Sequence, residues 1–83
     1  METADIYLNI TSPEISLLGL MVGKVTLPGQ SGRFTILPGH APMISALSEG
    51  DIEYTVGGKP TLMHVKSGFV EVSGNKVSVC VEI

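Results

Sequence analysis

The chain has 83 residues, of which 43% are hydrophobic, and its eight acidic and five basic residues give a formal net charge of −3. A chain this short forms one domain, expected over residues 1–83, and its core is modest, so part of its apolar surface is expected to meet a partner. The basic residues are spread singly, which argues against nucleic acid as a partner. The single cysteine excludes a disulfide framework and disfavours structural zinc.

The N-terminal twenty residues include Glu2, Asp5 and Glu14 and have no basic segment, so they do not resemble a signal peptide. We therefore expect a protein that stays in the cytoplasm. The longest dense apolar run, residues 15–22, is far shorter than the roughly 20 residues that span a bilayer as a helix. We expect no direct membrane insertion, so any link to a membrane would pass through another protein.

Short segments between glycines and prolines alternate between apolar and polar residues with a period of two, which predicts strands. These predicted strands cover residues 6–11, 24–27, 33–36, 51–56, 59–66, 70–72 and 76–83. In the last of them, Val77, Val79, Val81 and Ile83 are expected to share one face. The stretch 41–47 stays open between strand or irregular structure and a helical turn, because Pro42 also suits the first position of a helix.

Two turns predict hairpins. Gly57-Gly58 tolerates the positive φ of a tight turn, and Ser73-Gly74-Asn75 separates the last two predicted strands. Eight or more short strands without a helical segment of useful length predict an all-β sandwich or flattened barrel.

Residues 15–22 interrupt the alternation, because Leu17, Leu18, Leu20 and Met21 would place apolar side chains on both faces of a strand. One interpretation is a bent strand that neighbouring loops cover. The other is a strand with one face covered by a partner subunit.

The central segment at residues 26–43, TLPGQSGRFTILPGHAPM, closely resembles the signature of ATP synthase epsilon subunits, which are similar to the mitochondrial delta subunit. Its specificity comes from the combination of glycines, two prolines, a histidine and apolar positions, whereas Pro-Gly-His alone is a common turn. Residues 8–14, 48–52 and 67–72 resemble further parts of the family in the same order. The resemblance covers nearly all of residues 6–83.

This resemblance implies a ten-stranded β-sandwich, so we expect a small flattened β-sandwich or barrel of about eight to ten strands. Family members usually continue into a C-terminal helical hairpin that restrains ATP hydrolysis and in some members binds ATP. The 83 residues hold no C-terminal helical hairpin. If Ile83 is the natural end of the protein, we expect no helical brake and no direct nucleotide binding. No cofactor is expected.

The resemblance further implies a non-catalytic rotor subunit in the central stalk of a bacterial F1Fo ATP synthase. Such a subunit would lie at the cytoplasmic face of the inner membrane as a peripheral part of F1. It would link the gamma subunit to the membrane c ring and so couple proton or sodium translocation to ATP synthesis, which other subunits catalyse.

By the same resemblance, the loop of Gln30, Ser31, Gly32 and Arg33 meets the polar loops of the c ring. Family members can carry an acidic residue where this chain has Arg33. A complementary change on the ring would then be required, because like charges brought together at an interface cost several kcal/mol. The alternative is that Arg33 is only a solvated strand residue.

Ser12 and His40 match positions that the family places near gamma. Each also has a local interpretation, since Ser12 precedes Pro13 as a turn-forming hydroxyl and His40 follows Pro38-Gly39 as a turn histidine that bonds the backbone.

An enzyme would need a nucleophile, a base and an orienting group, and the chain offers only Cys80, two histidines and scattered carboxylates. Cys80 lies between valines, which predicts a buried or half-buried unreactive thiol. His64 is expected on the polar face of a hairpin strand, far in sequence from His40, so no metal site and no catalytic residue are expected. The alternative function is a free-standing small β-barrel binding module, although side chains fill the interior of a small barrel.

Overall fold

The computed structural model describes residues 5–83, and all regular structure within them is β-strand. Its nine strands are β1 (Ile6–Thr11), β2 (Ser16–Val22), β3 (Val25–Gly29), β4 (Gly32–Ile36), β5 (Met43–Leu47), β6 (Gly50–Val56), β7 (Lys59–Val65), β8 (Ser67–Ser73) and β9 (Lys76–Glu82). The predicted all-β fold is confirmed, and the stretch left open at 41–47 contains a strand. The first four positions of the predicted domain, Glu2 among them, lie outside the described residues. Within 5–83 no helix has the length and hydropathy to cross a membrane.

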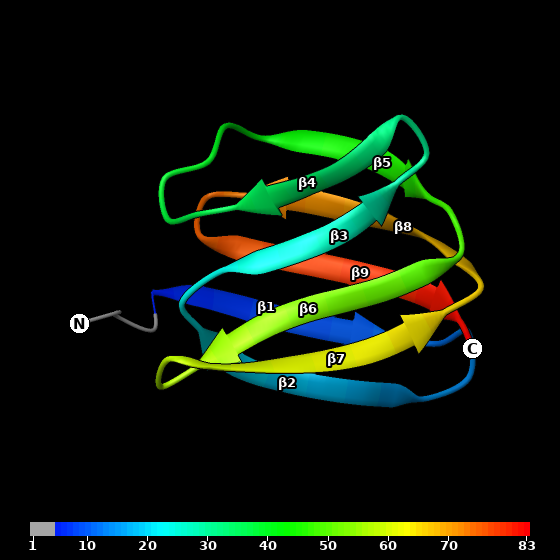
Figure 1. The fold of residues 1–83 in the computed structure, drawn as a ribbon, viewed down its shortest axis with the longest axis horizontal. Coiled ribbons are helices and arrows are strands. Elements are labelled where there is room, and N and C mark those ends of the chain that lie inside the picture. The colour runs from blue at the N-terminus through cyan, green and yellow to red at the C-terminus, as the bar shows by residue number, and fades with distance from the viewer. Residues whose placement is uncertain (1–4) are drawn as a thin grey trace.

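The strands form one sheet that curls into two layers (Figure 1). Their order is β2-β1-β9-β8-β5-β3-β6-β7, and β4 pairs with β3 off this path. The β1–β9 pair is parallel and the other pairs are antiparallel. A single residue pair, Gly29 with Leu47, joins β3 to β5. The sheet bends there, so β2, β1, β9, β8 and β5 form one layer and β4, β3, β6 and β7 form the other.

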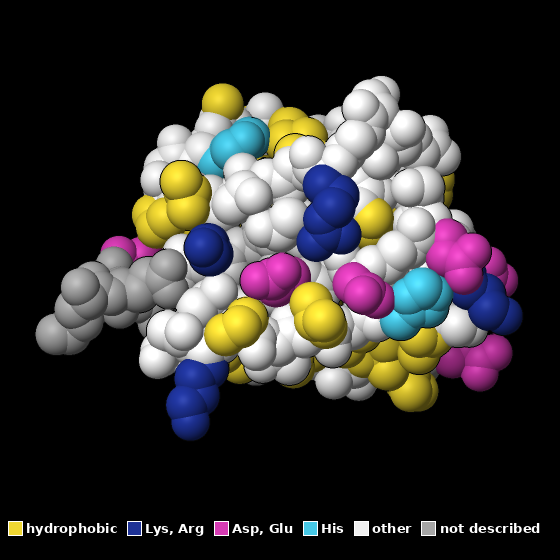
Figure 2. Space-filling model, viewed as in Figure 1, with side chains coloured by type: hydrophobic (Ala, Val, Ile, Leu, Met, Phe, Trp, Pro, Cys, Tyr) yellow, Lys and Arg dark blue, Asp and Glu magenta, His cyan; other side chains and the backbone are white. Residues whose placement is uncertain are grey.

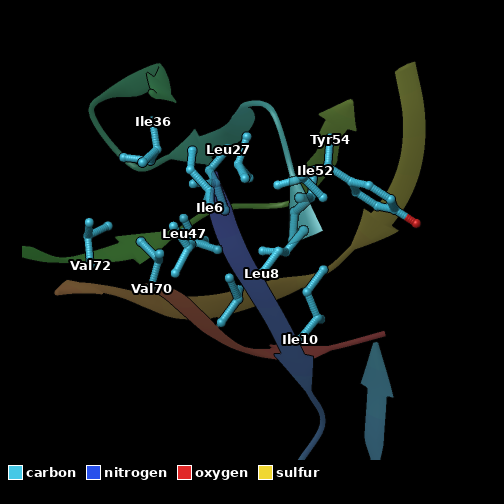
Figure 3. Packing of buried hydrophobic residues seen from close by; sticks show 14 of the residues in the cluster. Ile6, Leu8, Ile10, Leu27, Ile36, Leu47, Ile52, Tyr54, Val70 and Val72 are labelled. Carbon is cyan, nitrogen blue, oxygen red and sulfur yellow. The ribbon is translucent and has the colours of Figure 1, made fainter. Parts of the chain in front are cut away.

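The core lies between these layers, where apolar side chains from both converge (Figure 3). Ile6, Leu8 and Ile10 of β1 alternate inward and are at most 1% exposed. Full burial of such a side chain contributes about 1.5–3 kcal/mol. The three valines of β9 also point inward, as predicted. Ile83, expected on their face, lies beyond the strand and is 60% exposed.

The two predicted hairpin turns are confirmed. Gly57 and Gly58 have φ values of 58° and 79°, and Gly74 has a φ of 61°. Glycine adopts this left-handed conformation without the steric cost that a Cβ brings.

One strand end departs from simple alternation. The period of two in residues 51–56 places Val56 on the same face as Ile52 and Tyr54, but Val56 is 40% exposed, whereas Thr55 is buried. The reason is a crossing segment that closes the open edge of the sandwich. The Gly23 N–H donates to the Thr55 carbonyl at 2.9 Å, and the Thr55 N–H donates to the Lys24 carbonyl at 3.2 Å.

Strand β2 is irregular, as the sequence indicated. Its pairing with β1 shifts register between Ile10 and Thr11, and a shift of this kind bends a strand. Leu17, Leu18 and Leu20 pack partly buried against the core. Met21 on this strand is 46% exposed. The irregularity is confirmed, whereas a cover of neighbouring loops and a partner over the exposed part both stay predictions.

Candidate functional site

The predicted contact residues fall at two opposite ends of the sandwich. Gly68 pairs with both Leu47 and Val81, and Thr11 pairs with Cys80, so β5 ends where β1 and β9 end. The loop 30–33 lies at this same end, because the Gln30 N–H donates to the Ala46 carbonyl at 3.2 Å. We call it the Arg33 end, and it is on the right of Figure 1.

The opposite end, which we call the His40 end, holds the β4–β5 loop and the β8–β9 turn. The two are joined by the Gly39 N–H, which donates to Oδ1 of Asn75 at 2.8 Å. The structure therefore brings Ser12 and the loop 30–33 to one end and places His40 at the other. Ser12 and His40 do not form a single site.

Arg33 is exposed but is not simply solvated. Its Nη1 donates to the carbonyl of Asp51 at 2.8 Å. Because β4 and β6 lie on opposite sides of β3, the Arg33 side chain crosses the outer face of this layer. Gln30, Ser31 and Gly32 are exposed beside it. Their contact with a c ring stays a prediction.

Ser12 and His40 both make the local contacts of their alternative interpretations. The Ile15 N–H donates to Oγ of Ser12 at 3.3 Å, and the Ser12 N–H donates to the Ile15 carbonyl at 2.9 Å. Nδ1 of His40 lies 2.7 Å from the Ala41 carbonyl oxygen. These bonds order the two turns and leave a role near gamma as a prediction.

A shallow groove crosses the outer face of β1, β9, β8 and β5. Its volume is about 310 Å³, and its lining includes Asn9, Thr11, Ile44, Phe69, Glu71, Ser78 and Cys80. The groove is largely apolar, because Ile44 is 76% exposed and Phe69 is 64% exposed. Phe69 pairs directly with Cys80 across the β8–β9 ladder. Exposed apolar side chains gathered in this way are typical of a protein contact surface.

The groove was not predicted from the sequence. The expectation that Cys80 is buried or half-buried is wrong, because the thiol is exposed. Val79 and Val81 occupy the inward positions of β9, so Cys80 between them points outward. Phe69 directly precedes the buried Val70, so alternation predicts that Phe69 points outward. This signal could have identified the groove.

The other layer presents a polar outer face, on which charged side chains gather (Figure 2). The His64 ring joins two carboxylates there. Nδ1 lies 2.9 Å from Oδ1 of Asp51, and Nε2 lies 3.2 Å from Oε2 of Glu49. The hydrogen bond to Asp51, followed by that to Glu49, raises the pKa of His64 above its ordinary value of 6.5. The prediction that His64 lies on the polar face of its hairpin is confirmed, but its two carboxylate partners were missed.

This cluster does not have the geometry of a metal site. The two carboxylates contact different ring nitrogens of His64, on opposite sides of the imidazole, so the three groups do not converge on one point. In the described part of the chain, no group of three His, Cys, Asp or Glu side chains is arranged to hold a metal ion.

A profile of the family described as ATP synthase, Delta/Epsilon chain, beta-sandwich domain matches residues 5–83. The chain belongs to this family. It is 44% identical over 78 residues to the ATP synthase epsilon chain of Nitratidesulfovibrio vulgaris (strain Miyazaki F), a match that covers 94% of this chain and 58% of the relative. It is 47% identical over 72 residues to the epsilon chain of Desulfitobacterium hafniense (strain DCB-2), covering 87% and 54%. This family member therefore spans little more than half the length of these relatives.

Solved structures agree with the family assignment. A chain in the Euglena gracilis mitochondrial ATP synthase, a structure described as OSCP/F1/c-ring, superimposes with a TM-score of 0.87 at 25% identity and covers 98% of this chain and 52% of that one. A chain in the central stalk/c-ring structure of the Tetrahymena thermophila enzyme gives a TM-score of 0.79 and covers 100% of this chain and 67% of that one. At 13% identity, the second likeness shows the fold alone.

Proposed function

We propose that this chain is a non-catalytic rotor part of a bacterial ATP synthase. In that role it links the gamma subunit to the c ring and so couples proton or sodium translocation to ATP synthesis. Its place is the cytoplasmic face of the inner membrane, where other subunits hold it. The observation that carries the proposal is the family match over residues 5–83, supported by relatives named ATP synthase epsilon chain.

The architecture suits a part that passes torque. The two layers enclose one continuous apolar core and are joined at both edges, by the Gly29–Leu47 pair and by the bonds of Thr55. Close-packed protein interiors are barely compressible and transmit strain. A force applied to one outer face of such a sandwich reaches the other without a hinge.

For gamma, we propose the outer face of β1, β9, β8 and β5. A partner that contacts both Ser12 and His40 must run along the seven residues of β9, a span of about 20 Å. The groove with Ile44 and Phe69 lies along this path. Its apolar side chains supply the buried contact, and the two turns lie at its ends.

For the c ring, we propose the Arg33 end. The exposed loop 30–33 is ordered there, because the Ser48 N–H donates to the Pro28 carbonyl at 2.8 Å and Arg33 bonds the Asp51 carbonyl. An ordered loop loses little conformational freedom when it binds, which favours a lasting contact. The cation of Arg33 calls for an acidic or neutral partner on the ring.

The gamma surface is tested by Phe69→Glu, measured as the affinity for gamma by isothermal titration calorimetry. We expect binding to weaken by about tenfold or more, because a charge enters the centre of an apolar contact. Leu62→Glu is the matched control, since Leu62 is 60% exposed on β7 in the other layer and receives the same charge.

Two results of this experiment distinguish an error in the gamma contact surface from an error in the rotor function. Equal affinity of Phe69→Glu and the unaltered chain would remove the groove from the gamma contact. Failure of the unaltered chain to bind gamma at all would contradict the rotor function and favour a free-standing binding module.

A further inference from the structure

His64 lies where the end of β7 meets the start of β6 and the turn directly before it. The ring stands on β7, Asp51 is its direct partner on β6, and Glu49 belongs to the turn before β6. The side chains of His64, Glu49 and Asp51 are 61%, 68% and 45% exposed, so protons exchange freely with solvent. The cluster is also close to Arg33, whose guanidinium bonds the Asp51 carbonyl.

The two contacts require an N–H donor at both ring nitrogens, and a neutral ring has only one. A neutral imidazole has one N–H donor and one bare nitrogen, whereas an imidazolium donates from both nitrogens. Both ring nitrogens of His64 face carboxylate oxygens, at 2.9 Å and 3.2 Å. Only the protonated ring satisfies both contacts, because in the neutral ring one carboxylate faces a lone pair.

We propose that His64 is a proton-operated latch: when protonated it ties the β6–β7 hairpin to the β5–β6 turn, and when neutral it releases one of the two carboxylates. Loss of the proton changes the charge at the Arg33 end by one unit, and Glu49, whose contact is the longer one at 3.2 Å, is the carboxylate that we expect to be released. The turn that carries Glu49 packs on the β3–β4 end through the bond from the Ser48 N–H to the Pro28 carbonyl. The latch thus acts on the loop 30–33. Only the identity of the partner at that loop rests on the proposed function, and the latch itself does not.

The charged groups around the latch favour the protonated ring. From β6, both Asp51 and Glu53 project on the outer face that His64 shares, and Glu49 adds a third carboxylate. Arg33 from β4 is the nearby cation, and its guanidinium is already bonded to the Asp51 carbonyl. Lys59 begins β7 and Lys66 follows it, and β2, which contacts β6, carries no charged residue. The hydrogen bonds to Asp51 and Glu49 accordingly raise the pKa of His64.

The direction of the pH dependence follows from this. A group whose pKa is raised by folding contributes stability that is fully present below its unfolded pKa and is lost as the pH rises through the folded pKa. For His64 the unfolded value is 6.5, and the loss lies above it. Because the cluster is exposed, salt weakens the effect.

The first test follows the His64 ring by NMR titration of the whole chain. The midpoint of the titration reports the pKa of His64. In the unaltered protein we expect this pKa to lie above 6.5, and in the double variant Glu49→Gln/Asp51→Asn we expect it to move down toward 6.5. An unchanged midpoint in the double variant would overturn the latch.

The second test compares thermal unfolding of three proteins between about pH 5 and 8, the range in which histidine titrates. His64→Arg keeps a cation with several donors at every pH, and His64→Gln never carries a charge. We expect the unaltered chain to match His64→Arg at the acidic end and to approach His64→Gln at the alkaline end. A parallel pH profile for all three proteins would overturn the proposal, whatever their absolute Tm values.

Discussion

At the residue scale, the hydroxyl of Thr55 is the most unusual feature of the core. The side chain is 4% exposed, and its Oγ1 has no hydrogen-bond partner among the described residues. The crossing segment at residues 23–24 uses the backbone groups of Thr55 and covers the side chain without bonding it. A buried polar group without a partner costs about 1–3 kcal/mol.

We predict that Thr55→Val raises the free energy of unfolding by about 1 kcal/mol, because valine has nearly the same shape and removes the unpaired hydroxyl. Urea unfolding measures the change. Thr26→Val is the control, since Oγ1 of Thr26 lies 2.9 Å from Oγ1 of Thr35 and that bond would be lost. Stabilisation by both substitutions, or by neither, would contradict this interpretation of Thr55.

Individual side chains divide clearly into those that the sequence predicts and those that it does not. Alternation placed Leu8 inside and His64 outside, because buried and more exposed residues alternate along β1 and over the last three residues of β7. Alternation failed at Thr55, because the segment at residues 23–24, which is distant in sequence, covers the Thr55 side chain. The contact between His64 and Asp51 could have been predicted, because counting outward from the Gly57-Gly58 turn along both strands pairs these two residues.

At the scale of elements, the pairing of β8 with β9 leaves no room for a Cβ at Gly68. A Cβ built there would collide with the carbonyl oxygen of Cys80 and would lie 3.2 Å from Cα of Val81. Both obstacles are backbone atoms, which cannot rotate away. The glycine is therefore required by the spacing of the two strands.

We predict that Gly68→Ala lowers the free energy of unfolding by about 1–3 kcal/mol, the usual cost of overpacking a fixed structure. Gly19→Ala is the matched control on the outer edge of the same layer. Its Cβ would lie 2.7 Å from Oη of Tyr7, the free end of an exposed side chain that can move aside. Equal losses from the two substitutions, measured by chemical unfolding, would argue against backbone contact as the cause.

The positions of the strands were easier to predict than which strands pair with each other. The period of two and the Gly-Gly turn identify β6 and β7 and also their register, because a hairpin is local. The parallel pairing of β1 with β9 joins opposite ends of the chain, and no local pattern encodes it. The irregularity of β2 was visible as a break in alternation, but its register shift depends on the pairing with β1.

At the scale of the whole molecule, the two outer faces differ in character. One carries the apolar groove of Ile44, Phe69 and Cys80, and the other carries the crossing Arg33 and the His64 latch. The family resemblance in residues 26–43 anticipated the sandwich, while the contrast between its faces emerged only when the strands were assembled. The proposed rotor role, which has two different partners, would use two different surfaces.

The single cysteine offers the most direct measurement of this account, because Cys80 is exposed within the groove. We predict that its alkylation by a maleimide slows sharply when the chain is bound to gamma. In the variant Cys80→Ser/Leu62→Cys, the thiol lies on the other layer and should react at the same rate in the free and bound states. A stable complex with gamma in which Cys80 reacts as fast as in the free chain would contradict the account.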